Sequence, residues 1–102
     1  MLNQVIAVGR LTKEVEIEKI DEKEISKITI AVPRSYKNLE GQYDTDFITC
    51  TLHQPIAGNT AEYCKKGDIL GIKGRIQSDG DKMEIIAEKV TFLSSKKESE
   101  EK

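Results

Sequence analysis

The residues best suited to binding lie in one stretch with the pattern of a β-strand, from Tyr43 to His53. Apolar and polar side chains alternate along it, and successive side chains of a strand point to opposite faces. The set expected to point outward is Phe47, Thr49, Thr51 and His53. Such a face can stack bases on its rings. Two other interpretations stay open: these residue types are favoured in strands anyway, and Phe47 could cover a subunit contact. Tyr43 is either a further ring or an anchor of the strand.

Cations accompany these rings at two other places in the chain. Lys73 and Arg75 are two residues apart in a second strand pattern, so they share an outward face or form a solvated edge. Tyr36 follows Pro33 in a loop and stands between Arg34 and Lys37. Bases stack on rings while cationic groups neutralise phosphates, so this combination indicates binding of a single nucleic-acid strand.

The sequence shows no constellation for catalysis. The single histidine has no identifiable acid or nucleophile partner, and no glycine-rich phosphate loop is present. Cys50 and Cys64 fit neither a zinc ribbon nor a CxxC motif, so we interpret them as small buried hydrophobic residues. We therefore expect no enzyme, no cofactor and no metal.

The elements that must position these residues are mostly strands. Clear strand patterns cover residues 2–8, 25–32, 43–53, 68–76 and 82–93, with a weaker alternation over 12–20. A hairpin turn is expected at 78–81. The only helical pattern covers 57–66, with Asn59 or Thr60 as the N-cap and Gly67 as a left-handed C-terminal stop. Five strands with a helix between the third and fourth predict an all-β OB-fold, a five-stranded Greek-key barrel.

Length and charge limit the possible partners. A chain of 102 residues predicts one domain, which we place at 1–93, followed by a short charged tail at 94–102 that we expect to be disordered. The N-terminus lacks a signal-peptide pattern and no apolar run could span a membrane, so we expect a cytoplasmic protein without membrane contact. The net charge of −2 is unusual for a nucleic-acid binder and argues against very tight binding, although the field of one face matters more.

Several segments resemble bacterial single-stranded DNA-binding proteins, in consistent order from residue 1 to about 93. The matching segments are MLNQVIAVGRLTK at 1–13, ITIAVPRSYKN at 28–38, DFITC at 46–50, TAEYCKKGD at 60–68 and GIKGRIQ at 71–77. The resemblance implies binding of single-stranded DNA in replication, repair or recombination. It places Tyr36 and Phe47 at aromatic stacking positions, the latter usually tryptophan, and His53 near a third. The family is typically homotetrameric with paired first strands, so the resemblance also implies a dimer or tetramer.

The sequence departs from the family in ways that bear on its partners. It has no tryptophan, its hairpin at 78–82 is short, and Pro55 stands where a basic residue is common. The acidic tip that recruits replication and repair proteins in the family is absent, so we expect a short variant whose protein partners stay open. The alternative is an OB-fold replication accessory, like primosomal replication protein B, that acts mainly through protein contacts.

Taken together, the strand faces, the loop and the resemblance predict one binding site for single-stranded DNA. Its predicted residues are Arg10, Arg34, Tyr36, Lys37, Phe47, Thr49, His53, Lys73 and Arg75.

Overall fold

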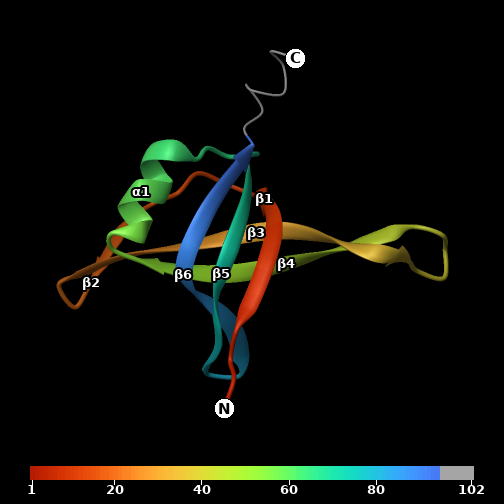
Figure 1. Cartoon of the computed structure of the whole chain (residues 1–102), viewed down its shortest axis with the longest axis horizontal. Helices are drawn as coiled ribbons and strands as arrows, with labels where there is room; N and C mark the ends of the chain where they lie inside the picture. The colour runs from red at the N-terminus through yellow and green to blue at the C-terminus, as the bar shows by residue number, and fades with distance from the viewer. Residues whose placement is uncertain (95–102) are drawn as a thin grey trace.

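Six strands and one helix make up the part of the chain that the computed structural model describes, residues 1–94 (Figure 1). In chain order the elements are β1 (Val5–Leu11), β2 (Glu18–Ile20), β3 (Lys23–Lys37), β4 (Tyr43–His53), α1 (Ile56–Tyr63), β5 (Ile69–Asp79) and β6 (Lys82–Ser94). The weak alternation over 12–20 yields only the three-residue β2. The predicted tail begins at Ser94, which still belongs to β6; residues 95–102 lie outside the described part.

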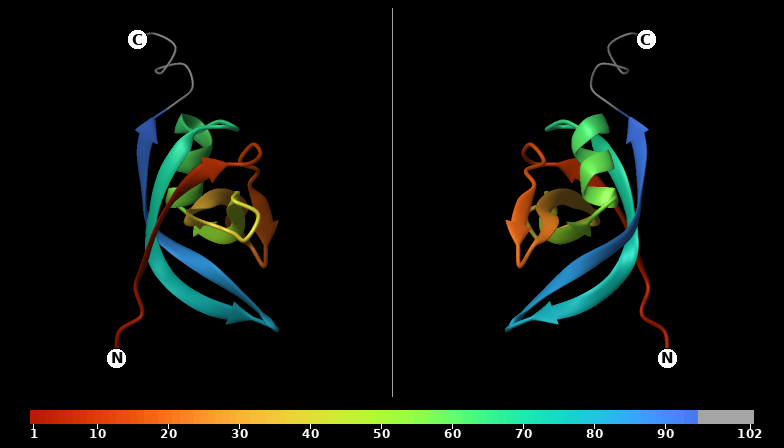
Figure 2. Two further views of the ribbon diagram at one scale, coloured as in Figure 1. Left: turned by 90° about the vertical axis from the view of Figure 1, so that its right-hand side faces the viewer. Right: turned by 90° about the vertical axis from the view of Figure 1, so that its left-hand side faces the viewer.

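Five of the strands close into a barrel. The strand order is β1-β5-β6-β4-β3-β2, and β1 also pairs with β3, so the ring closes and leaves β2 outside it. All pairings are antiparallel except β4 with β6, which is parallel. Figure 2 shows β1, β5 and β6 as one wall and β3 with β4 as the other. The strand order and the helix between β4 and β5 confirm the predicted OB-fold.

Two glycines let neighbouring strands approach closely where the barrel closes. A Cβ at Gly9 would lie 2.8 Å from the Ala31 carbonyl oxygen and 2.9 Å from Cγ2 of Val32. A Cβ at Gly74 would overlap the Ile86 carbonyl oxygen and lie 2.9 Å from its carbonyl carbon. Any side chain at either position would therefore push β1 from β3, or β5 from β6.

The barrel interior is filled by the apolar side of the strand alternation. Its most buried side chains include Leu11, Ile28, Ile30, Leu52, Leu70 and Ile72. Both cysteines are buried free thiols, as predicted, and burial raises the pKa of Cys50 to about 12 and that of Cys64 to about 11. The thiols therefore behave as small neutral core groups at neutral pH.

The helix differs from its prediction in extent and in capping. It spans Ile56–Tyr63 and ends where Cys64 turns extended, so it is shorter than the expected 57–66. Pro55 occupies the N-cap without a side-chain cap, and Gln54 Oε1 accepts a hydrogen bond from the Gly58 amide at 2.9 Å. The predicted caps Asn59 and Thr60 both lie inside the helix and so cannot be its N-cap, and the Thr60 side chain is buried.

The predicted stop at Gly67 also has another place in the structure. Gly67 does adopt a left-handed φ of +97°, but it lies in the turn before β5 rather than directly after the helix. Its amide donates to the Leu11 carbonyl at 2.9 Å, which ties this turn to the end of β1.

Within residues 1–94, no helix is long and apolar enough to cross a membrane.

Candidate nucleic-acid interface

Phe47 stands on the outer face of the β3–β4 wall with most of its ring free. The strand register sets it opposite Ala31, and sets Thr49 opposite Thr29 and Thr45 opposite Pro33. Phe47 is 69% exposed, because its cross-strand neighbour is small. The predicted outward orientation of Phe47 and Thr49 is confirmed, and their face combines one open ring with hydroxyl groups.

Arg10 joins this face from β1. It pairs with Ala31 on one side and with Ile69 on the other, so Ile69, Arg10, Ala31 and Phe47 form a row across β5, β1, β3 and β4. Neighbouring strands lie about 4.8 Å apart, which puts the backbones of Arg10 and Phe47 about 10 Å apart. The Arg10 guanidinium donates to the Gly67 carbonyl through Nη1 at 2.6 Å, so its position is fixed while its remaining donors stay available.

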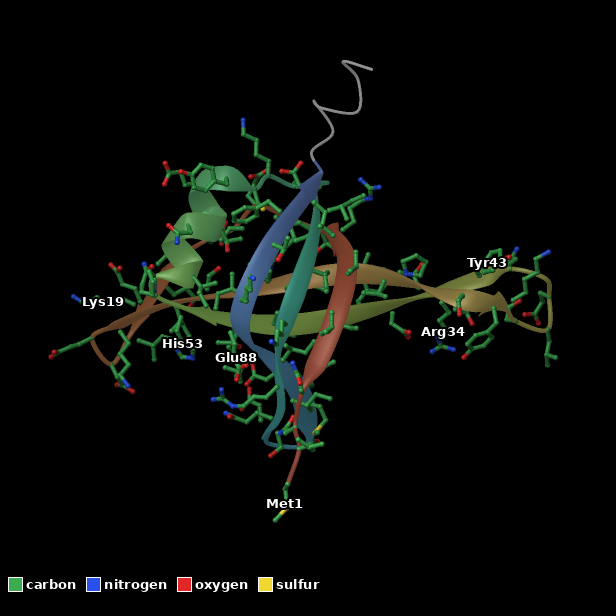
Figure 3. The ribbon with its side chains drawn as sticks, in the orientation of Figure 1. Met1, Lys19, Arg34, Tyr43, His53 and Glu88 are labelled. Carbon is green, nitrogen blue, oxygen red and sulfur yellow. The ribbon has the colours of Figure 1, made fainter. Side chains whose placement is uncertain are left out.

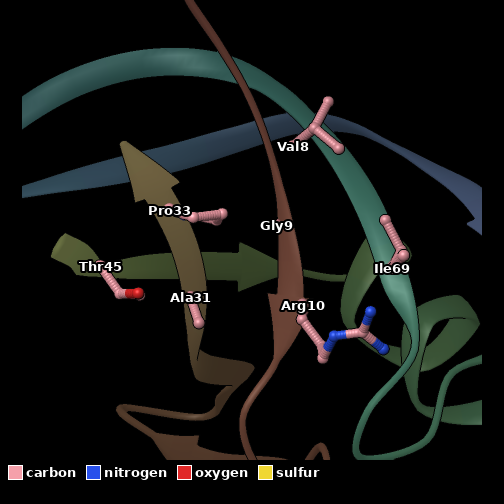
Figure 4. Close-up of a pocket in the computed structure, with 7 residues that line it drawn as sticks. All are labelled: Val8, Gly9, Arg10, Ala31, Pro33, Thr45 and Ile69. Carbon is pink, nitrogen blue, oxygen red and sulfur yellow. The ribbon is translucent and has the colours of Figure 1, made fainter. Parts of the chain in front are cut away.

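A shallow groove of about 340 Å³ opens on the same outer surface, between β1 and the base of the β3–β4 hairpin (Figure 4). Its lining residues are Val8, Gly9, Arg10, Ala31, Pro33, Thr45 and Ile69. The walls are mainly apolar, with the Thr45 hydroxyl and the Arg10 side chain as polar groups. A flat apolar ligand with polar edges, such as a nucleobase, matches this lining.

The hairpin between β3 and β4 projects far beyond the barrel and has two different faces (Figure 1). Pairing of Lys37 with Tyr43 resumes after an irregularity that begins at Pro33. Lys37 Nζ lies 5.9 Å from the centroid of the Tyr43 ring, so this cation and this ring share one face. The predicted stacking residue Tyr36 is 63% exposed, but it lies in β3 rather than in a loop, and its side chain is beside Arg34 on the opposite face from Lys37.

The predicted cation Arg34 is already paired. Its guanidinium binds the Asp46 carboxylate with N–O distances of 2.9, 3.1 and 3.3 Å, and Asp44 lies 3.9 Å away (Figure 3). The hydrogen bonds with Asp46, followed by its charge, raise the pKa of Arg34 further, and the same bonds lower the pKa of Asp46. A phosphate would have to displace Asp46 before it could use this charge.

Lys73 and Arg75 are exposed, as predicted, but they do not lie beside Phe47. Lys73 pairs with Ile6 of β1 and with Lys89 of β6. β5 pairs with neither β3 nor β4. Lys73 points out of the barrel from β5, so its side chain is directed away from the β3–β4 wall. Arg75 Nη1 lies 3.4 Å from Glu88 Oε2. The predicted single site, which combined residues of the strands now labelled β4 and β5, is therefore split across two walls of the barrel.

The far end of β4 also differs from the prediction. Thr51 was expected to point into solvent, but β6 pairs alongside it and the residue is buried. Its hydroxyl donates to the Glu84 carboxylate. His53 is exposed at the end of β4, six residues from Phe47 and thus about 20 Å along the strand. Bound DNA could contact both Phe47 and His53 only if it ran along β4.

The groove could not be predicted from the sequence. Val8, Pro33 and Ile69 are ordinary apolar residues from three separate segments, and only barrel closure brings them together. Thr45 was detectable in principle, because it shares the odd-numbered alternation of Tyr43 and Phe47.

Comparisons with known proteins bear on this surface. Residues 2–93 match the model of the "Single-strand binding protein family". The chain is 39% identical over 106 residues to "Single-stranded DNA-binding protein B" of Bacillus subtilis, covering 94% of each chain. It is 40% identical to "Single-stranded DNA-binding protein 3" of Listeria innocua, covering 94% of this chain and 66% of the relative.

A solved structure supports the fold independently. The small single-stranded DNA-binding protein from Streptomyces coelicolor superposes with a TM-score of 0.73, covering 91% of this chain and 95% of that one. At 19% identity, this likeness supports the barrel alone.

Proposed function

Because the chain belongs to the single-strand binding protein family, we propose that it binds single-stranded DNA, with little sequence preference, on the outer face of β3 and β4. The observation that carries the placement is the row of Arg10, Ala31 and Phe47. It sets a largely exposed ring within reach of a cation, across a residue too small to cover either. Every base has a π-face, so stacking on Phe47 tolerates any sequence.

Phosphate neutralisation supplies the second part of the proposed mechanism. Arg10 and Lys37 stand at the two ends of the face and would attract the DNA backbone. Lys73 and Arg75, on the other wall, would contribute to a longer strand that continues around the barrel. Arg34 would contribute less than these, since Asp46 already balances its charge. Counterion release on phosphate contact makes such binding weaker as salt rises.

Self-association is part of the same proposal. β1 pairs with β5 from Val5 to Arg10, whereas only Arg10 and Leu11 pair with β3. The other edge of residues 5–9 therefore has no partner strand within residues 1–94. The outward side chains there are Ile6, 70% exposed, and Val8, 50% exposed. An unpaired apolar edge favours addition of a second strand, and we propose a dimer or tetramer formed partly through β1.

The cellular role proposed here follows from the binding activity. A protein of this family would cover exposed single strands during replication, repair or recombination, without itself catalysing a step. It would act in the cytoplasm, where it meets bacterial DNA.

Titration of the parent chain and Phe47→Ala with oligo-dT tests the site. Loss of one stacked base costs ~1–3 kcal/mol, so Phe47→Ala should bind about 5- to 150-fold more weakly. Tyr63→Ala is the comparison variant and should bind as the parent does, because it removes an exposed ring from α1, away from this face. A parent chain that fails to bind at low salt would refute the proposal and favour an accessory that acts through protein contacts.

A further inference from the structure

We propose that Tyr43 is a second base-stacking residue, and that bound DNA follows β4 outward from Phe47, past the groove at Thr45, to Tyr43. This inference rests on the proposed function and adds the direction of the strand and a further contact. The alternation along β4, the position of the groove and the distribution of charge on the hairpin support it.

The strand geometry puts the two rings on one face. β4 runs without interruption from Tyr43 to His53, so Tyr43, Thr45 and Phe47 all point to the outer side. At about 3.3 Å per residue, Tyr43 and Phe47 stand about 13 Å apart. Rings at this separation cannot contact the same base, so each would hold a different one. Tyr43 is 57% exposed and Phe47 is 69% exposed, which leaves both rings open for stacking.

The groove lies between the two rings. Thr45, halfway along the line from Phe47 to Tyr43, is one of the groove's lining residues, and Pro33 opposite it is another. Val8 of β1 forms part of the opposite wall. A nucleotide between the two stacked bases would therefore lie over an apolar depression, where it can turn its base or sugar inward. The surface from Phe47 to Tyr43 forms one continuous track rather than two isolated contacts.

Charge separates the two faces of the hairpin. On the Tyr43 face, Lys37 Nζ lies 5.9 Å from the ring centroid and would meet a phosphate next to a base stacked there. On the other face, Asp44 and Asp46 surround Arg34, and their two carboxylates outnumber its single charge. A polyanion is attracted to the first face and repelled from the second, which favours Tyr43 as the contact at this end of the track (Figure 3).

The rival role for Tyr43 is to hold the hairpin together. Within residues 1–94 its hydroxyl takes part in no hydrogen bond, and most of its surface is exposed. Leucine at position 43 would keep an apolar side chain on the hairpin and would remove the ring's π-face together with the hydroxyl. Tyr43→Leu therefore separates stacking from anchoring, and Tyr43→Phe tests whether the hydroxyl matters.

The experiment measures affinity for oligo-dT of increasing length at constant low salt. Tyr43→Ala and Tyr43→Leu should each weaken binding of the longer oligonucleotides about 5- to 10-fold, and Tyr43→Phe should bind as the parent does. The shortest oligonucleotide whose affinity is lowered by Phe47→Ala should bind the Tyr43 variants as tightly as the parent. A strand that short cannot reach both rings. Tyr63→Ala is the matched control: this tyrosine is 63% exposed but lies on α1 beside Phe92, away from the face.

The outcomes are separable from those of the proposed function. If the parent binds and Phe47→Ala weakens binding, but Tyr43→Leu binds every length as the parent does, the inference is wrong while the proposed function stands. A loss with Tyr43→Ala that Tyr43→Leu restores, together with a lower melting temperature, would assign Tyr43 to anchoring and overturn the inference. No binding by the parent would remove the proposed function itself.

Discussion

Substitution of Gly74 by alanine gives the sharpest test of how the barrel closes. The new Cβ would overlap the Ile86 carbonyl oxygen and lie 2.9 Å from its carbon and 3.1 Å from Cα of Ala87, all backbone atoms that cannot rotate away. Overpacking of this kind costs up to about 3 kcal/mol. Replacing glycine reduces the entropy of the unfolded chain, which returns about 0.4–1 kcal/mol. The net loss is about 2 kcal/mol, or a fall in melting temperature of about 8–16 °C for a domain of this size.

Gly71→Ala supplies the matched control on the same strand. Its Cβ would meet Leu93 Cδ1 at 3.6 Å, Val8 Cγ2 at 3.8 Å and Thr91 Cβ at 3.9 Å, which are ordinary side-chain contacts. Gly71→Ala should therefore keep or raise the melting temperature. Thermal and urea unfolding, followed by circular dichroism, compare the two variants with the parent. Equal stability of Gly74→Ala and the parent, or equal losses in both variants, would refute the assigned close approach of β5 and β6.

Three further predictions concern charge, assembly and the buried thiols. Lys37→Ala should make the slope of log K against log salt for oligo-dT shallower by ~0.7, and Arg34→Ala by less, because Asp46 already neutralises Arg34; an equal change in both would contradict this. Sedimentation at high micromolar concentration should show a species larger than the 11.5 kDa chain, and Ile6→Lys should shift it toward the monomer; a parent that is only monomeric would exclude assembly. The pKa of Cys50 rises from 9.0 to about 12 on folding, so the free energy of unfolding should fall as pH rises from about 9 toward 12, and less so in Cys50→Ala. Equal pH slopes in urea unfolding of these two chains would contradict the assignment to this thiol.

Where prediction from sequence succeeded, the signal was local. The alternation of Ile48, Cys50 and Leu52 with Phe47 and Thr49 identified a strand with one buried side, because a pleated strand turns successive side chains to opposite faces. The order of strands and helix then indicated the barrel. Helix ends were less well predicted, since Thr60 and Gly67 have suitable types for caps but take positions set by the barrel and by the turn before β5.

The site was only partly predictable for the same reason. Sequence alone determined which side chains each strand turns outward, and so identified Phe47, Lys73 and Arg75 as exposed. Only the tertiary structure decided which of them meet: barrel closure pairs Arg10 with Ala31, one strand from Phe47, and leaves Lys73 opposite Ile6, four residues away from Arg10 along β1. It also buried Thr51 under β6 and paired Arg34 with Asp46. Alternation fixes a side chain's direction relative to its own strand, whereas its neighbours depend on strand pairing and curvature, which join residues far apart in the chain.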